Sequence, residues 1–398
     1  MNPYVLDWLS ALLRWAHLIT GIAWIGASLH FIRVDNSLLK PAAPDDLNKG
    51  VGGEMWAVHG GHFYHQQKYS RPPARLPESL HWSMWESYST WLTGFALFSV
   101  LYLFNASTFL VDPSVHAWSP TAAVIAALGC LVGFWIIYDV ICRLFGGLKH
   151  GDLIVGVLVI AVVVLAAWLS CALFAGRAAF LLVGAMLATA MSANVLFWII
   201  PGQQDDVAAL RRGQPVDPTN SRRGRQRSVH NTYLTLPVVF AMLSNHHSFL
   251  FTAKANWLVL VAIMVAGALI RLSFVLRHKA LAERRAVPWR FAIAGCLILV
   301  VIVLVLAPAP RAPGVVGKQV EFDQVQAVIG LRCAPCHNGQ VQQKNVDLHT
   351  PELIRQHSLA VYQQVSVLKL MPLNNATRIT DDERDLIKRW FEAGASLD

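Results

Sequence analysis

Long apolar runs constrain this chain more than any other feature. A run of about 20 apolar residues is long enough to cross the ~30 Å hydrocarbon core of a bilayer as a helix. With 55% hydrophobic and only 14% charged residues, the 398-residue chain is too apolar for an ordinary soluble protein. We therefore predict eight transmembrane helices. The runs span residues 5–34, 81–111, 119–142, 153–175, 178–200, 229–250, 256–276 and 289–307.

The first run is not a secretory signal peptide. The opening residues, MNPYVLDW, contain no basic side chain, and no cleavage site of small residues follows the apolar stretch. We expect this run to remain in the protein as a membrane helix.

Basic residues are distributed unevenly between the loops that join these helices. With the N-terminus outside, the outer loops carry only Arg177 and Lys254. Because basic loops stay in the cytoplasm, both termini are predicted to be periplasmic in a bacterial inner membrane. The inner-loop residues are Arg33, Lys40, Lys49, Lys68, Arg71, Arg75, Arg143, Lys149, Arg211, Arg212, Arg222, Arg223, Arg225, Arg227, Arg277, Lys279, Arg284, Arg285 and Arg290.

The net charge of +9 is therefore mostly a signal of topology. The run RRGRQR at 222–227 is interpreted as a basic loop beside the membrane, and no nucleic-acid partner is expected.

The stretch GLRCAPCHNGQ, residues 330–340, contains the attachment signal of a c-type haem. In such a motif Cys333 and Cys336 bind the haem vinyl groups, and His337 is a ligand of the iron. A zinc half-site would need a second ligand pair, and no second CxxC is present. A thiol redox pair would open a helix after a strand, which the surrounding sequence does not suggest.

The residues around this motif predict a complete small cytochrome c domain. Met371 lies in a loop, followed by a proline, and is expected to be the second axial ligand of the haem iron. A helix at 322–331 precedes the motif, and a final amphipathic helix opens with a capping box of Thr380 and Glu383. We thus predict an all-α chain: a membrane bundle (1–306), a Pro/Gly-rich linker (307–320) and a periplasmic cytochrome c domain (321–398).

Polar side chains inside the predicted helices gather towards the cytoplasmic face. Polar residues in a membrane are costly, so such a group marks a candidate pocket. Hydrogen bonds that only stabilise the bundle are the alternative for each residue taken alone. The group contains His30, Glu86, Asp139, Asn194, His230, Asn231, Tyr233 and Arg271.

The first inner loop, GGEMWAVHGGHFYHQQKYS at 52–70, is rich in histidine, aromatic residues and amides. A metal site at His59, His62 and His65 is conceivable, but the glycine pair after His59 disfavours a rigid ligand face. The composition suits stacking on a flat heteroaromatic ring, and His59 and Tyr64 are the candidate contacts.

Four segments give the chain a resemblance to a known family. The sequences RWAHLITGIAWIGASLHF, EMWAVHGGHFYHQQK, LHWSMWESYSTWLTG and SVHNTYLTLPVVFAMLSNHHS, with a C-terminal CxxCH unit, resemble membrane-bound urate oxidases (urate hydroxylases). The resemblance implies oxidation of urate to 5-hydroxyisourate in purine catabolism. Electrons would pass to the c-type haem and on to a downstream cytochrome or terminal oxidase, without forming peroxide.

The roles of individual residues in that reaction follow from depth and chemistry. Urate is a flat anion, so Arg271, Asn194 and Asn231 are expected to hold its edges. Oxidation also removes a proton, for which His230 is the first candidate base and Glu86 the second.

Two further questions stay open on the sequence. A haem b inside the membrane would bridge the distance to the periplasm, and depth allows His17 with His246 or His247, or His30 with His230, as its ligands. Structural histidines with satisfied hydrogen bonds are the alternative. The chain can also be a non-catalytic, membrane-anchored cytochrome subunit of a dehydrogenase or quinol-oxidising complex, or, less favoured, a quinol-dependent or porphyrin-type oxidase.

Overall fold

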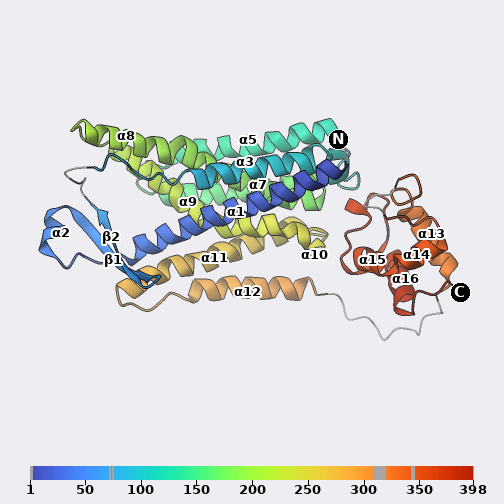
Figure 1. Cartoon of the computed structure of the whole chain (residues 1–398). Helices are drawn as coiled ribbons and strands as arrows, with labels where there is room; N and C mark the ends of the chain where they lie inside the picture. Colours follow the sequence, from blue (N-terminus) through green and yellow to red (C-terminus); the bar gives the residue numbers. More distant parts are fainter. Residues whose placement is uncertain (1–2, 71–72, 74–75, 308–319, 342–345, 398) are drawn as a thin grey trace.

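The computed structural model describes residues 3–70, 73, 76–307, 320–341 and 346–397. It is mostly helical, with an elongated bundle followed by a smaller C-terminal unit (Figure 1). The predicted linker at 307–320 falls almost entirely outside the described residues. The long bundle helices are α1 (Pro3–Ser37), α3 (Trp85–Phe98), α5 (Pro120–Phe145), α6 (Gly151–Leu173), α7 (Gly176–Asn194), α9 (Pro218–Leu243), α11 (Asn256–Ala282) and α12 (Arg290–Val305).

Shorter helical turns connect or extend these helices. They are α2 (Pro44–Asn48), η1 (Ser99–Leu103), α4 (Ala106–Phe109), η2 (Val195–Ile199), α8 (Ile200–Arg211), η3 (Ser244–His246) and α10 (Ser248–Phe251). Both η1 and η2 are π-helical turns, and each continues the long helix before it.

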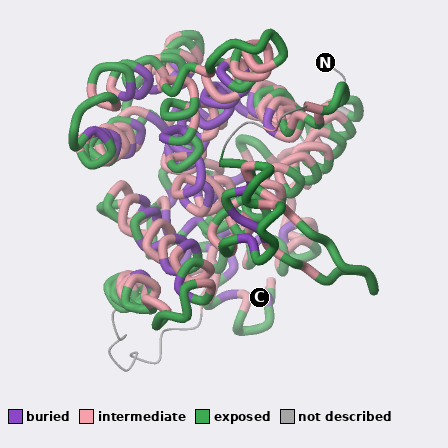
Figure 2. The backbone as a smooth tube through the Cα atoms, turned by 90° about the vertical axis from the view of Figure 1, so that its left-hand side faces the viewer, coloured by how far each residue is buried: buried purple, intermediate pink, exposed green. Residues whose placement is uncertain are grey.

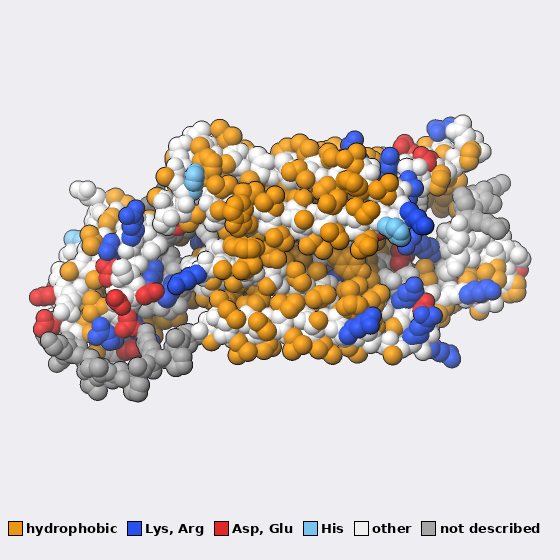
Figure 3. Space-filling view, turned by 180° about the vertical axis from the view of Figure 1, so that it is seen from behind, with side chains coloured by type: hydrophobic (Ala, Val, Ile, Leu, Met, Phe, Trp, Pro, Cys, Tyr) orange, Lys and Arg blue, Asp and Glu red, His pale blue; other side chains and the backbone are white. Residues whose placement is uncertain are grey.

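Five helical segments of the described chain are long and apolar enough to cross a membrane. Their outward surface agrees with that role, because an 18-residue window of α1 contains no buried residue. Figure 3 shows hydrophobic side chains covering the middle of the bundle and charged ones towards its ends. Such a surface would be unstable in water but suits lipid. The five segments are Tyr4–Ser37, Pro120–Phe145, Gly151–Leu173, Gly176–Arg211 and Asn256–Ala282.

The other three predicted crossings are also largely helical. They correspond to α3 with η1, to α9 and to the shorter apolar helix α12. The count of eight crossings stays a prediction, because these three do not meet the same criteria of length and hydropathy.

Helix α7 is the centre of the bundle and packs against α3, α5, α6 and α9. Two thirds of its most apolar window is buried, far more than in the other spans. Small residues permit this packing: a Cβ atom added at Gly184 would lie 2.8 Å from the Cβ of Ala241 on α9. Figure 2, viewed along the bundle, shows the buried residues concentrated between the helices.

The structure corrects two expectations for the first and third inner loops. The first forms an antiparallel hairpin of β1 (Val51–His59) and β2 (His62–Tyr69), so the chain is not all-α. Two glycines with positive φ, Gly60 and Gly61, form its turn, which explains the Gly-Gly pair. The basic run at 222–227 is not a loop but part of α9, where Arg227 is fully buried.

The C-terminal unit has a hydrophobic core of its own, formed by residues between Phe322 and Ala395. The predicted first helix is confirmed as α13 (Phe322–Arg332), and the last as α16 (Asp381–Glu392), which begins with the expected Thr380–Glu383 capping box. Between them lie α14 (Pro351–Gln356), α15 (Ser358–Val361), η5 (Tyr362–Val367) and η6 (Leu373–Asn375).

The N-terminus and the C-terminal unit lie at the same end of the bundle, opposite the hairpin (Figure 1). The Ser248 hydroxyl at this end donates a hydrogen bond to the Leu368 carbonyl oxygen, and α4 contacts η6. An even number of membrane crossings requires this arrangement of the two ends.

Reporter fusions test the predicted orientation of the bundle. A reporter active only in the periplasm should be active after Asp398 and silent when inserted after Gln214, between α8 and α9. The opposite pattern would place the hairpin end of the bundle outside and contradict the distribution of basic residues.

Candidate active site

A chain of hydrogen bonds inside the bundle joins three of the predicted site residues through a tyrosine. The Tyr138 hydroxyl on α5 lies 2.8 Å from His230 Nδ1 on α9. Asn194 Nδ2, at the end of α7, donates to the Tyr138 oxygen (2.9 Å) and to Asn231 Oδ1 (3.0 Å). Asn231 Nδ2 in turn donates to the Met191 carbonyl oxygen (3.0 Å). Three helices therefore contribute to one buried polar cluster.

Two departures from regular helix lie next to this cluster. The π-helical turn η2 begins directly after Asn194, and such turns often occur at functional sites because they redirect side chains. Pro237 interrupts the hydrogen bonds of α9 two turns beyond His230. Both features fall in the two helices that carry the asparagines and the histidine.

The tautomer of His230 decides what this cluster can do. If the Tyr138 hydroxyl donates to Nδ1, the proton of the neutral ring sits on Nε2, which can then only donate. If Nδ1–H donates to the Tyr138 oxygen, Nε2 is free to accept a proton. The Tyr138 oxygen accepts from Asn194 Nδ2 and has a second lone pair, which can accept from His230 Nδ1–H in this arrangement. The site therefore has a hydrogen-bond pattern in which His230 is a base.

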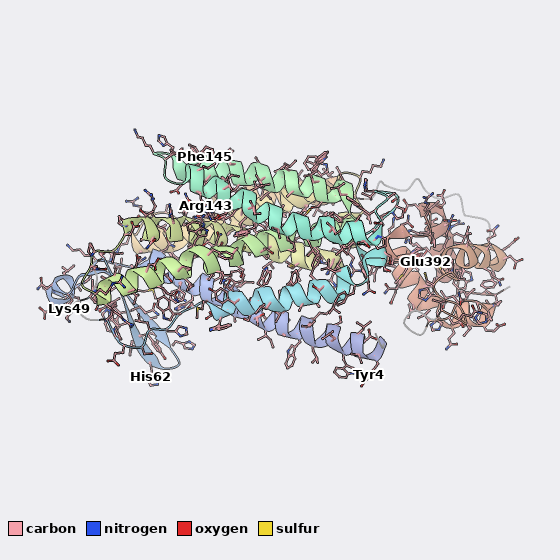
Figure 4. The ribbon with its side chains drawn as sticks, turned by 90° about the horizontal axis from the view of Figure 1, so that it is seen from above. Tyr4, Lys49, His62, Arg143, Phe145 and Glu392 are labelled. Atoms are coloured by element: carbon pink, nitrogen blue, oxygen red, sulfur yellow. The ribbon has the colours of Figure 1, made fainter. Side chains whose placement is uncertain are left out.

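A buried ion pair lies next to the cluster. Arg227 Nη2 is 2.7 Å from Asp139 Oδ1, and the two residues are 1% and 5% exposed. Arg143 Nε is 2.6 Å from the other oxygen of Asp139, and the Arg227 guanidinium lies 4.2 Å from the ring centre of Trp198. Arg143, labelled in Figure 4, lies towards the hairpin end. The pair fixes α5 against α9 beside Tyr138 and His230.

Arg271 on α11 is buried, and its Nε and Nη2 atoms have no hydrogen-bond partner among the described residues. Asp139 is not its counter-ion, because both carboxylate oxygens are used by other arginines. Its electrostatic neighbour is Tyr233, one turn along α9 from His230. An unpaired guanidinium at this depth is expensive unless an anion binds to it.

Glu86 lies in the first turn of α3 and is half-buried. No hydrogen bond or ion pair of its carboxylate is found within the described ranges. The next residue, Ser87, donates to Ser192 on α7 (3.1 Å), two residues before Asn194. Glu86 is thus near the end of α7 but is not linked to the His230 cluster.

His59 and Tyr64 lie on the hairpin and are not joined to the cluster. His59 pairs with His62 at the turn, and Tyr64 pairs with Ala57. Figure 4 shows the tip, labelled at His62, projecting away from the helices. Their contact with a substrate stays a prediction.

The histidines considered as haem b ligands make no direct contact with one another among the described residues. His17 Nδ1 lies 3.1 Å from the Thr90 carbonyl oxygen, and its ring packs against Gly94. Within the described part of the chain, no hydrogen bond or ring contact joins His17 to His246 or His247, or His30 to His230. A membrane haem stays a prediction.

In the C-terminal unit, the CxxCH residues follow α13 directly. Cys333 is buried, which raises the pKa of its thiol to about 11, whereas Cys336 is exposed. His337 Nδ1 lies 3.2 Å from the Val346 carbonyl oxygen. A donor bond from Nδ1–H to this oxygen leaves Nε2 free to bind a metal, which is the usual arrangement of an axial histidine.

A buried arginine holds the loop of Met371. Arg384 Nη1 donates to the carbonyl oxygens of Met371 (2.7 Å) and Val365 (2.5 Å), and the Met371 side chain packs against the core. Arg332 pairs with Glu383 (2.9 Å) at the start of α16. Although burial alone would raise it, Arg332 and the Thr380 amide hold the pKa of Glu383 below its usual value.

No group of three or more His, Cys, Asp or Glu side chains that could hold a metal ion occurs in the described residues. A haem iron takes four ligands from its ring and needs only two from the protein. His337 has the chemistry of one such ligand, and Met371, packed against the same core, has that of the other; their binding of a haem iron stays a prediction.

The sequence did not indicate three residues of this site: Tyr138, Arg227 and Trp198. A tyrosine beside Asp139 inside an apolar run was an available signal, because a buried hydroxyl needs a partner. The burial of Arg227 had no such signal, since its run resembles a solvated loop.

The fold and site define a class of protein: a helical bundle, with helices long and apolar enough to cross a membrane, that holds a polar, hydrogen-bonded site in its interior. The family described as urate oxidase N-terminal matches residues 3–307, and the chain belongs to it. Membership indicates a urate-related function and oxidoreductase activity on urate. No curated protein and no solved structure matches the chain.

Replacing Asp139 tests the energetic role of the ion pair. Asp139→Asn leaves Arg227 buried without a counter-charge and should cost about 3–5 kcal/mol of unfolding free energy in mixed detergent micelles. The control Glu283→Gln removes only two exposed ion pairs, with Lys279 and Arg285, and should cost less than about 1 kcal/mol. Equal effects of the two changes would show that the Asp139 pair does not hold the helices together.

Proposed function

We propose that the chain oxidises urate to 5-hydroxyisourate inside the membrane bundle and passes the electrons to a c-type haem in its C-terminal unit. The observation that carries the proposal is the buried cluster of Tyr138, His230, Asn194 and Asn231, which lies within the segment that matches the family. The CxxCH motif and the Met371 loop support the electron acceptor.

Recognition of urate uses the unpaired groups of this region. Among the described residues, Arg271 Nε and Nη2 have no acceptor, and the buried Asn194 Oδ1 has no donor. Urate is anionic and has both ring N–H groups and carbonyl oxygens, so it can supply both missing partners. His59 and Tyr64, on the hairpin, are proposed contacts outside the bundle.

The proton leaves urate to His230. Its Nε2 accepts the proton when Nδ1–H donates to Tyr138, and the hydroxyl holds the ring in that orientation. Glu86 is the second candidate base. Water then adds to the oxidised ring, so that urate and water give 5-hydroxyisourate, two protons and two electrons.

The residues of the C-terminal unit fit a covalently attached haem. Cys333 and Cys336 would form the thioethers, while His337 and Met371 would hold the iron. When bound, this group would accept the electrons one at a time and deliver them to a downstream cytochrome or terminal oxidase. Arg384 keeps the Met371 loop in place for this role.

Substitutions in the bundle test the proposed site with the purified full-length chain. His230→Ala should lower the rate of urate oxidation at least a hundredfold, because it removes the base. Tyr138→Phe should lower it about tenfold through loss of one orienting hydrogen bond. Arg271→Lys should raise the KM for urate about tenfold or more, because an ammonium cannot replace the planar fork. Oxidation is followed as loss of urate with oxidised soluble cytochrome c as the acceptor.

Matched controls are His150→Ala and Arg285→Lys, which change exposed residues outside the cluster. Both should oxidise urate normally and produce no hydrogen peroxide. Normal activity of the His230 and Arg271 variants would place the pocket elsewhere. A chain that never oxidises urate, but carries electrons from a partner dehydrogenase, would be an electron-transfer subunit.

Met371 is the only methionine of the C-terminal unit, which makes its proposed role simple to test. Met371→Ala should remove the absorption band of the sulfur–iron bond and lower the haem reduction potential, while the haem stays attached. Absorption spectra and a redox titration measure these changes. A band that persists in the variant would identify a different axial ligand; Met84→Ala is the control.

A further inference from the structure

One face of the β1–β2 hairpin is apolar and exposed. Cross-strand neighbours place Val58 opposite Phe63 and Trp56 opposite His65 on this face. Trp56, Val58 and Phe63 are 63%, 69% and 77% exposed. In a two-stranded sheet such side chains normally require a covering layer.

The base of the hairpin is fixed, so the exposed tip has a defined position. Glu54 accepts hydrogen bonds from the Ala42 amide (2.9 Å) and His65 (2.7 Å). Its backbone pairs with Leu39 in both directions, at 2.8 and 2.9 Å. The ring of Trp56 also stacks on His65, with centres 4.1 Å apart.

This position is beside the membrane-crossing part of the bundle. The hairpin follows α1, a candidate membrane span that ends at Ser37. From α2 the strands turn back towards the bundle in Figure 1. In Figure 4 the tip, labelled at His62, lies to one side of the helices and nearer the middle of the bundle than Lys49 does. The tip therefore lies to the side of the bundle, where a membrane crossed by α1 would place lipid.

The charge of the segment suits a lipid surface. Residues 55–70 contain no Asp or Glu, one lysine and three histidines. Aromatic side chains combined with basic and neutral polar groups are typical of the headgroup region of a bilayer, whose cytoplasmic leaflet is negatively charged.

We propose that the hairpin tip inserts Trp56, Val58 and Phe63 into the headgroup region of the leaflet at its end of the bundle. The insertion anchors the first inner loop to the bilayer independently of urate oxidation. A second copy of the chain, packed against the same three side chains, is the less favoured alternative. Three side chains provide at most about 500 Å² per partner, below the roughly 800 Å² of a stable interface.

Spin labels on the full chain in nanodiscs of zwitterionic and anionic phospholipid test the proposal. The labelled variants are Phe63→Cys at the tip and Lys49→Cys at the exposed position directly after α2. The signal of the unlabelled-site parent chain, which has its own cysteines, is subtracted from each. Collision with oxygen, which concentrates in lipid, is compared with collision with a water-soluble nickel chelate. The ratio of the oxygen collision rate to the nickel-chelate collision rate should be at least fivefold higher at position 63 than at position 49.

A label at Val58→Cys should behave like the one at position 63, and both residues are exposed enough to be replaced without disturbing the fold. Equal ratios at positions 63 and 49 would show that the tip is in water, and would overturn the proposal. Low collision rates with both oxygen and the nickel chelate, together with spin–spin broadening, would show that a second copy of the chain covers the tip. That result would also overturn the proposal.

Discussion

The ion pair between Asp139 and Arg227 is the interaction on which the geometry of the bundle site depends. Two opposite charges buried at 2.7 Å must stay together, because separating them would leave Arg227 without a counter-charge in a low-dielectric interior and Asp139 with only the exposed Arg143. Asp139 follows Tyr138 directly on α5, and Arg227 lies one turn before His230 on α9. The pair thus sets the register of the two helices and brings the tyrosine hydroxyl onto the imidazole. Central helix α7 adds Asn194 from the third side.

The distance between this site and the C-terminal unit determines how far electrons must travel. Leu243, near the end that contacts the C-terminal unit, is thirteen positions beyond His230 on α9, or about 20 Å at 1.5 Å per residue. In the proposed reaction, electrons must cross this distance to reach the CxxCH unit. A further redox group between the helices would shorten it, which is the physical reason for considering His17 and the histidines near residue 246.

Much of the fold was predictable because two rules are strong in this sequence. The length of the apolar runs identified the helical segments. The CxxCH motif marked the end of α13, and the capping box marked the start of α16. The hairpin was not predicted. Gly60 and Gly61 were taken only as evidence against a metal site, and their role as a turn between two strands was not recognised. In the site, depth brought together His230, Asn194 and Asn231 correctly. It could not show that Arg227 is buried or that Glu86 stands apart, because both depend on helix rotation and register.

The most direct test of this mechanism is an anaerobic titration of the purified full-length chain with urate. If the bundle oxidises urate and the electrons pass to the C-terminal unit, urate alone should reduce a covalently bound c-type haem, seen in the reduced-minus-oxidised spectrum, with 5-hydroxyisourate formed and two electrons released for each urate. A haem that dithionite reduces but urate does not, in a chain with an intact fold, would contradict it.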